Sequence, residues 1–474
     1  MKRYCALLPL VLAGCAAIPK GPPAELAGQV PSTWTAAAAV GPVHTQWWAG
    51  LGDSLAAGLV GQVLEHNHNL QAAAARLDAA LAQARIAGAP LWPQAGVDLS
   101  GARSRRNFIG LPIPGAGDQV LASTNTTYGA SLNLNWEVDL WGRLRAGSAA
   151  ARADVEAALA DLRGAHLSLT AQTLRACFAA VEGRRQVELA QAAVDNFRLS
   201  AQQVRTQYER GLRPSLDLRL ALSSQAGAEA SLAQRQRLYR ATLRQLEVLA
   251  GRYPGALLQP SADLPPLPPP APAGLPAELV GRRPDLVAAE RRLAAADARL
   301  VAARAALYPR LSLTASGGRS SGELGDLLDG DFAVWNLVAN LSQPLLQGGR
   351  LRAGVDLARA GREGAVAAYA QSLLQAYAEV ESALDAETFL QTQEQALRTA
   401  ADEALAARRL AEDRYARGLS DMITLLTAQN SAFESESRWL ATRRQQLDAR
   451  IDLHLALGGG FAPEPAPEAS SRPE

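Results

Sequence analysis

The stretch that decides the fold is Tyr128–Leu140, YGASLNLNWEVDL. Its even-numbered positions are apolar and its odd-numbered positions are polar or glycine, which predicts a β-strand with one apolar and one wet face. Its 13 residues exceed the usual strand length and suffice to cross a membrane at a tilt. The rings of Tyr128 and Trp136 suit a lipid-facing wall. The alternative is a small soluble sheet packed on helices.

Three further stretches alternate in the same way: Leu311–Ser316, Ala333–Leu341 and the shorter Val97–Ser100. They predict two hairpins with loops at 105–126 and 319–331, both rich in Gly, Ser, Asn or Asp. Four strands cannot close a barrel, and an open sheet edge is not tolerated in lipid. Since a membrane barrel needs about eight strands or more, the chain is expected to be an obligate oligomer.

The chain also contains an internal repeat. Gly142–Ala146 (GRLRA) recurs 207 residues later as Gly349–Ala353, and Tyr208–Leu212 recurs as Tyr415–Leu419 at the same spacing. In each half a proline-free stretch of about 65 residues predicts a helical rod of roughly 100 Å. A glycine, Gly211 or Gly418, then stops the rod. The last helix has apolar positions every seven residues, which is typical of coiled-coil packing: Leu426, Phe433, Leu440 and Leu447, followed in register by His454.

Composition supports an elongated, helix-rich chain. It has 474 residues with Lys+Arg 47 and Asp+Glu 46, a net charge of +1, so there is no basic excess for nucleic acid. Three cysteines exclude a disulfide framework. A Pro-rich connector separates the halves. The predicted division is 1–14 signal peptide, 15–52 extended segment, 53–253 first repeat, 254–281 connector, 282–461 second repeat and 462–474 disordered tail.

The N-terminus has the pattern of a bacterial lipoprotein signal. Lys2 and Arg3 precede the apolar run ALLPLVLA, and Leu12–Cys15 (LAGC) follows. The run is too short for a membrane helix. We expect cleavage before Cys15 and lipidation of that cysteine, with sorting to the outer membrane because Ala16 is not aspartate. An ordinary signal peptide is the alternative. Cys177 is expected to be a small packing residue.

In its motifs and its internal repeat the chain resembles the TolC/OprM family of outer-membrane efflux proteins, most closely its NodT-like lipoprotein branch. The motifs run in the family's order from about residue 34 to 461: Trp47-Trp48 with Asp53 and Leu55, Asn67–Gln71 (NHNLQ), Trp136–Arg143 (WEVDLWGR), Arg282–Leu286 (RRPDL), Leu307–Pro309 (LYP), Tyr415–Leu419 (YARGL) and Ala456–Gly460 (ALGGG).

The resemblance implies a mainly helical fold with a membrane β-barrel portion. Three chains would share one 12-stranded barrel, four strands each, above a periplasmic coiled-coil tunnel. The protein would lie in the outer membrane, lipid-anchored at Cys15. It would be the exit duct of a tripartite efflux system, with a periplasmic adaptor and an inner-membrane pump of the resistance-nodulation-division type. It would conduct small toxic compounds or drugs passively, with no cofactor, metal or catalytic residue.

The resemblance also places functional residues at the tip of the helices. The adaptor would contact the turns at Gly211, Leu212, Gly418, Leu419, Ser420 and Asp421. Tyr415 would face Asp217 in a lock that holds the closed state, although a helix-start role for Asp217 explains it equally. An arginine that joins the lock in some members falls at Ser420, so Arg417 or Arg414 is the expected substitute. The acidic entrance rings of the family fall at Thr424 and Thr427.

Other classes of protein fit less well. His66 and His68 lie on different faces of a helix, which disfavours a shared metal, and no GxSxG, phosphate loop or CxxC occurs. A periplasmic adaptor would lack the membrane alternation, and a structural coiled-coil lipoprotein would not need the strands. Within the channel class, type I protein secretion is the alternative to efflux. Two methionines argue weakly against a thioether-lined copper route.

Overall fold

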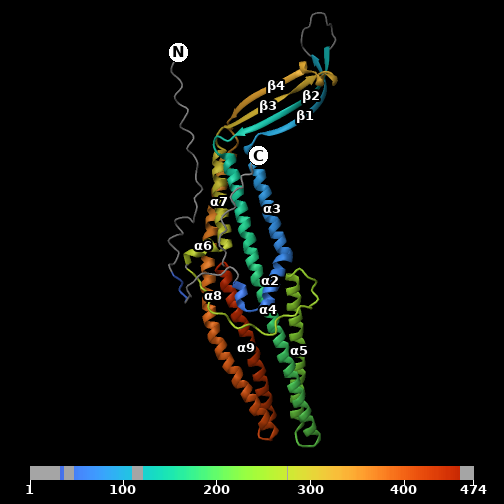
Figure 1. Ribbon diagram of the computed structural model, residues 1–474, viewed down its shortest axis with the longest axis vertical. Coiled ribbons are helices and arrows are strands. Elements are labelled where there is room, and N and C mark those ends of the chain that lie inside the picture. Colours follow the sequence, from blue (N-terminus) through green and yellow to red (C-terminus); the bar gives the residue numbers. More distant parts are fainter. Residues whose placement is uncertain (1–32, 37–46, 109–120, 275, 460–474) are drawn as a thin grey trace. The chain divides into compact units, whose positions relative to one another are not determined.

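The computed structural model describes residues 33–36, 47–108, 121–274 and 276–459. The predicted signal peptide, Cys15 and the predicted tail lie outside the described residues. The principal elements (Figure 1) are α2 (Ser54–His66), α3 (His68–Gly88), β1 (Gln94–Phe108), β2 (Leu121–Val138), α4 (Arg143–Glu209), α5 (Ser215–Leu249), α6 (Leu279–Arg282), α7 (Pro284–Ala305), β3 (Arg310–Ser321), β4 (Ala333–Ser342), α8 (Arg350–Ala416) and α9 (Met422–Ala456).

The internal repeat is visible in these elements. The rods α4 and α8 have 67 residues each, and the return helices α5 and α9 have 35 each. At 1.5 Å per residue each rod is about 100 Å long. The predicted long helices and tight turns are therefore confirmed. No helix in the described part of the chain is both long enough and apolar enough to cross a membrane.

The chain divides into two compact units. Among the described residues, the sheet unit comprises 78–157 and 290–368, and the helical unit comprises the residues up to 77, 158–289 and those from 369 onward. The long helices α4 and α8 each contribute to both units.

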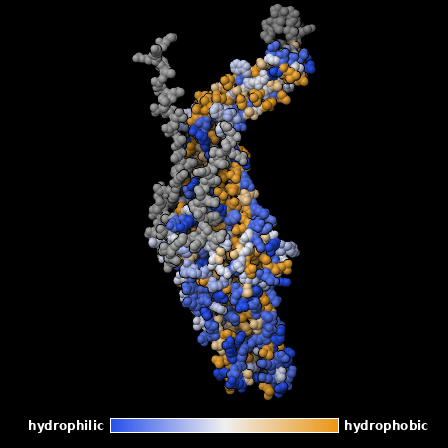
Figure 2. Space-filling view, viewed as in Figure 1, coloured by the Kyte–Doolittle hydropathy of each residue, from blue (hydrophilic) through white to orange (hydrophobic). Residues whose placement is uncertain are grey.

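The sheet unit contains one antiparallel sheet in the order β1-β2-β3-β4. Its register aligns the apolar positions of all four strands, so that Leu134 pairs with Ala95 and with Ala315, which in turn pairs with Leu337. One face consequently carries exposed apolar side chains: Val97, Leu99, Leu132, Leu134, Trp136, Trp335, Leu337 and Leu341. Figure 2 shows hydrophobic residues along this unit.

The opposite face of the sheet is mainly polar. The alternation places Asn133 beside Ser316, and Asn135 beside Thr314, on that face, whereas Val334 and Val338 of β4 interrupt it. β1 and β4 are the two edges, and neither has a second partner strand among the described residues. The predicted one-sided alternation is confirmed.

The predicted hairpin loops were too long. β1 continues to Phe108 and β2 begins at Leu121, where loop residues 105–126 were expected; similarly β3 extends to Ser321. The ladder is made by backbone groups, so Gly101–Phe108 pairs with Leu121–Tyr128 although the apolar alternation has ended there.

The motif after β2 joins the sheet to α4. The carboxylate of Asp139 accepts hydrogen bonds from the backbone N–H groups of Leu144 (3.1 Å) and Arg145 (2.8 Å), two of the unpaired donors at the helix start. Glu137 pairs with Arg143 at 2.8 Å. Gly142, with φ +76°, makes the sharp turn between them. These residues hold the first turn of α4 at the end of β2.

In the helical unit the motif residues also satisfy backbone groups. Asp53 caps α2, and the Oδ1 atom of Asn67 accepts from the amides of Asn69 and Leu70 at the start of α3. The buried Arg283 pairs with Asp285 and Glu379 at 2.7 Å each and donates to the carbonyl of Ala456.

The Pro-rich connector is held by its carbonyl groups. Proline has no N–H donor, and the Arg450 Nη1 atom donates to the carbonyl oxygen of Pro268 at 2.9 Å. At the start of the connector, the nearly buried Glu247 accepts three backbone N–H bonds, from Ala256, Leu257 and Leu258.

The predicted heptad seam of α9 packs inward at Leu426, Leu440 and Leu447. Cys177 is 5% exposed in the core that contains Leu440 and Leu447, and burial raises the pKa of its thiol to about 12. It is the packing residue that the sequence predicted.

Candidate gate and docking surface at the helical tip

The two turns that end the rods have the same backbone. Gly211 and Gly418 have φ of +72° and +75°, a region that glycine adopts without strain. In the first turn the amide of Leu212 donates to Gln207 O (2.8 Å) and that of Gly211 to Tyr208 O (2.9 Å); the second turn repeats both bonds. This is a Schellman arrangement, which satisfies the last helical carbonyls. In Figure 1 both turns lie at the same end of the helical unit.

Large apolar side chains project from these turns into solvent. Leu212 and Leu419, which are 207 residues apart, are 69% and 64% exposed, and the next equivalent pair, Leu216 and Ile423, is 61% and 63% exposed. The tip therefore presents two equivalent apolar points.

Tyr415, near the end of α8, lies inside the tip core. It is 4% exposed and packs with Phe197, Val204 and Leu425 among others. The guanidinium of Arg213, from the α4–α5 turn, lies 4.7 Å from the centre of the Tyr415 ring. This cation–π contact joins the first helical hairpin to the second.

Asp217 reaches the same cluster through Arg213. An Arg213 Nη1 atom lies 3.9 Å from Asp217 Oδ2, and Arg213 Nε donates to Gln207 Oε1 at 3.3 Å. The Tyr415 hydroxyl has no hydrogen-bond partner among the described residues. Burial raises the pKa of Tyr415; Arg213 lowers it and Asp217 raises it further. The structure thus places Asp217 and Tyr415 on either side of one arginine.

The other predicted tip residues lie on the surface. Asp421 caps α9 by accepting the Thr424 amide at 2.7 Å, and this hydrogen bond lowers the pKa of the exposed Asp421 carboxyl. Thr424 and Thr427 are exposed, and Ser420 is half-buried. Arg417 pairs with Asp413 on its own helix at 2.8 Å, so its contact remains within α8 and the turn that follows.

Sequence reasoning missed Arg213, although the repeat carried a signal for it. Arg213 stands 207 residues before Ser420, so it occupies in the first half the position where an arginine was sought in the second. Reading the tip across both halves would have found it.

A buried polar layer above the tip was also missed. Gln429 of α9 is 1% exposed, and its Nε2 atom lies 3.2 Å from both Ser200 Oγ of α4 and Glu412 Oε1 of α8. Asn196 of α4 donates to the same Glu412 oxygen at 3.0 Å. The layer ties three helices together, and its members looked like ordinary surface residues in the sequence.

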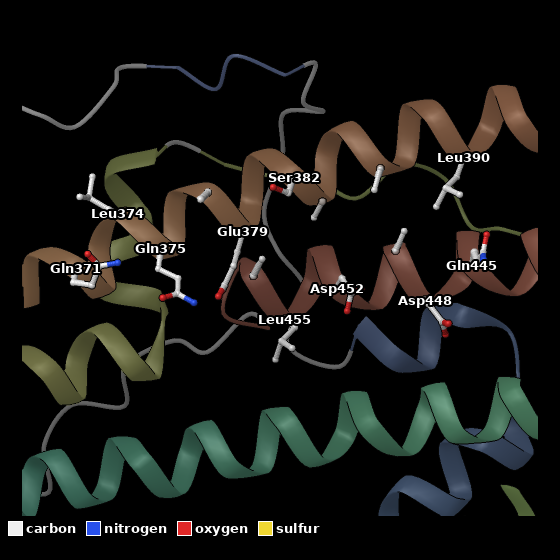
Figure 3. Close-up of a pocket in the computed structure, with 15 residues that line it drawn as sticks. Gln371, Leu374, Gln375, Glu379, Ser382, Leu390, Gln445, Asp448, Asp452 and Leu455 are labelled. Carbon is white, nitrogen blue, oxygen red and sulfur yellow. The ribbon is translucent and has the colours of Figure 1, made fainter. Parts of the chain in front are cut away.

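A groove of about 970 Å³ runs between α8 and α9 (Figure 3). Its wall carries three carboxylates, each paired with an arginine: Glu379 with Arg283 at 2.7 Å, Asp448 with Arg444 and Asp452 with Arg175. Burial raises the pKa of Asp448 to about 6, against the opposing effect of Arg444 and Arg175. The Glu379–Arg283 and Asp452–Arg175 pairs join different elements of the helical unit, whereas the Asp448–Arg444 pair lies within α9.

The chain is similar to known outer membrane proteins over most of its length. The sequence profile of the family "Outer membrane efflux protein" matches residues 59–252 and 275–459. The pyoverdine export outer membrane protein OpmQ of Pseudomonas putida is 32% identical over 470 residues, which is 97% of this chain and 98% of that protein. The antibiotic efflux pump outer membrane protein ArpC of Pseudomonas putida is 31% identical, covering 96% of this chain and 95% of that protein.

The solved CmeC outer membrane channel of Campylobacter jejuni superposes with a TM-score of 0.85 at 23% identity, covering 89% of each chain. The chain therefore belongs to the outer membrane efflux protein family. The predicted family is confirmed, and so is the predicted fold class of a mainly helical chain with a small antiparallel sheet.

Proposed function

We propose that this protein is the outer-membrane exit duct of a tripartite efflux system. It conducts small toxic compounds passively from an inner-membrane pump and its adaptor to the outside, and it catalyses no reaction. The sheet carries the proposal: four antiparallel strands with one exposed apolar face, one polar face and two open edges. Lipid suits the first face and a water-filled lumen the second.

The open edges define the assembly. An unpaired strand edge is costly in lipid, so β1 of one chain pairs with β4 of the next until the sheet closes. With three chains of four strands the barrel has 12. Asn133, Asn135 and Thr314 then line the lumen, and Leu132, Leu134 and Trp335 contact lipid.

The tip is the proposed site of partner contact. The exposed leucines Leu212 and Leu419, with Gly211, Gly418, Ser420 and Asp421 beside them, dock a periplasmic adaptor that is bound to a pump of the resistance-nodulation-division type. The similarity to outer membrane proteins named for pyoverdine export and for antibiotic efflux favours efflux over protein secretion. Thr424 and Thr427 leave the entrance without an acidic ring.

The chain has a lipid anchor at its N-terminus and two repeats that build the duct. Cys15 carries the lipid anchor in the outer membrane, following removal of residues 1–14. The repeats 53–253 and 282–461 each supply one pair of strands and one helical hairpin to the duct, and the connector 254–281 joins them.

A matched pair of substitutions tests the orientation of the sheet. Leu132 and Asn133 are neighbours on opposite faces. Asn133→Arg should keep the trimer and change the conductance and ion selectivity of single channels in a planar bilayer. Leu132→Arg should impair insertion, since an arginine on the lipid face costs about 2–4 kcal/mol at mid-membrane.

The purified wild-type trimer supplies the reference. Discrete conductance steps are expected from the wild type if its tip is open at rest. If the wild-type tip is closed, variants that open it should give the steps. A water-soluble monomer without steps, or an Asn133→Arg variant that fails to insert while Leu132→Arg inserts normally, would overturn the duct assignment.

A further inference from the structure

Two arginines stand at the end of the sheet's apolar face. Arg103 and Arg105 belong to β1 and pair in register with Thr126 and Thr124 of β2. Their odd numbering puts them on the same face as Val97 and Leu99, because side chains two residues apart along a strand share a face. Both are exposed.

The apolar band ends just before these arginines. On β2 it runs from Trp136 to Tyr128, eight residues or about 26 Å along the strand, close to the roughly 25 Å band of a membrane barrel. Tyr128 pairs with Gly101, and Arg103 follows two residues later, about 7 Å further along the strand. The arginines therefore lie at headgroup level, beyond the interfacial ring.

The guanidinium groups are available for a ligand. Neither Arg103 nor Arg105 has an ion pair or side-chain hydrogen bond within the described part of the chain. Arg319, the next basic residue on this face, is already used, since its Nη1 atom donates to Leu327 O at 3.0 Å. A guanidinium offers a planar pair of donors that matches phosphate oxygens. The hydroxyls of Thr124 and Thr126 lie directly across the ladder, within the reach of the same headgroup.

We propose that Arg103 and Arg105 bind the phosphate groups of an anionic lipid in the outer leaflet, at three equivalent sites around the trimer. The inference rests on the proposed barrel, which turns the apolar face toward lipid and the hairpin end away from the helices. In the acidic hairpin between β3 and β4 the Asp326 and Asp329 carboxylates already accept hydrogen bonds from Ser321 Oγ and the Asp331 amide. The exposed Glu323 and Asp331 of a neighbouring chain are the competing partners, and trimer dissociation in lipid-free detergent tests them.

The same strand provides a matched control. Arg106 is exposed and adjacent to Arg105, but its even position puts it on the polar face, toward the lumen. Arg105→Gln and Arg106→Gln each remove one charge, so these two single variants differ only in the face that they alter; Arg105→Gln alone should weaken the binding of an anionic lipid about 5-fold.

The test is lipid binding to the detergent-purified trimer, measured by native mass spectrometry with diphosphoryl lipid A as the probe and phosphatidylcholine as the neutral lipid. Arg103→Gln with Arg105→Gln should weaken lipid A binding about 30-fold, from about 1 kcal/mol per basic residue near an anionic surface. Arg106→Gln should leave binding unchanged. Replacement of both arginines by lysine should give an intermediate loss, since the charge remains and the planar pair of donors does not.

Three results would overturn the proposal: unchanged lipid A affinity in the double glutamine variant, an equal loss in Arg106→Gln, or a double variant whose trimer dissociates at lower temperature in lipid-free detergent. The last would assign the arginines to contacts between chains. The conductance of the same samples is recorded to separate failure of this inference from failure of the proposed duct. If the double glutamine variant gives conductance steps and binds lipid A as the wild type does, the lipid site is rejected and the duct is retained.

Discussion

Arg213→Gln tests whether the arginine–tyrosine contact holds the tip closed. Arg213 and Tyr415 belong to different helical hairpins and meet at 4.7 Å, so any opening that separates the hairpins breaks the contact. The Arg213–Asp217 pair lies within one hairpin and survives such an opening. Of the two contacts of the Arg213 guanidinium, only the cation–π contact with Tyr415 crosses between the hairpins, so it is the one that Arg213→Gln removes from the closed state.

The free energy of the Arg213–Tyr415 contact can be estimated from the burial of the two side chains. With the ring 4% exposed and the arginine half-buried, the contact contributes about 1 kcal/mol. If three chains open together the closed state loses about 3 kcal/mol, or about 100-fold in the ratio of closed to open channels at 1.4 kcal/mol per factor of ten. The assay is open probability in single-channel recordings of the purified trimer.

Two controls decide between mechanisms. Arg219→Gln removes an exposed arginine of α5 that has no described partner, so it should leave open probability unchanged. Tyr415→Phe keeps the ring beneath Arg213 and removes only a hydroxyl that has no described hydrogen bond, so it should also gate normally. Unchanged gating in Arg213→Gln refutes the reasoning. Opening by Tyr415→Phe would instead favour a direct lock between Tyr415 and Asp217.

Three further outcomes are expected. Leu212→Asp with Leu419→Asp should abolish co-purification of the adaptor while the trimer mass is retained; continued pairing would remove the turns from the docking surface. In Cys15→Ala, mass spectrometry of the purified protein should no longer detect covalently attached acyl chains, while the conductance steps of the channel remain. The raised pKa of Asp448, about 6 against a usual 3.8, means that the folded state holds its proton more tightly than the unfolded state. Stability should therefore fall by about 2 kcal/mol as pH rises from 4 to 6, and Asp448→Asn should flatten that part of the dependence of stability on pH.

The faces of the sheet could be predicted from sequence, whereas its extent could not. Alternation in Tyr128–Leu140 identifies an apolar and a wet face because burial, or lipid, selects side chains by parity. Beyond Gly101 both faces are largely polar, so side-chain chemistry no longer distinguishes strand from loop. The backbone ladder continues to Phe108 regardless, and only the three-dimensional pairing reveals it.

The sequence motifs identified the family through residues that hold backbone together. Asp53, Asn67 and Asp139 cap helices, and Arg283 binds a carbonyl and two carboxylates. Such roles depend on local chain geometry, because each carboxylate, amide or guanidinium pairs with backbone groups at a helix end. They say nothing about what passes through the duct, because none of them lies on the polar face of the sheet or at the tip.

The tip shows how one repeated backbone acquires two different roles. Tyr208 and Tyr415 occupy equivalent positions, yet Tyr208 is 43% exposed and Tyr415 is 4% exposed. Arg213 and Asp217 in the first half correspond to Ser420 and Thr424 in the second. The first hairpin thus has an arginine and a tyrosine of its own, yet the Arg213 guanidinium lies over the buried ring of Tyr415 in the second hairpin. Because the second hairpin has a serine in place of the arginine, the contact is made in one direction only, and its loss measures the separation of the two hairpins.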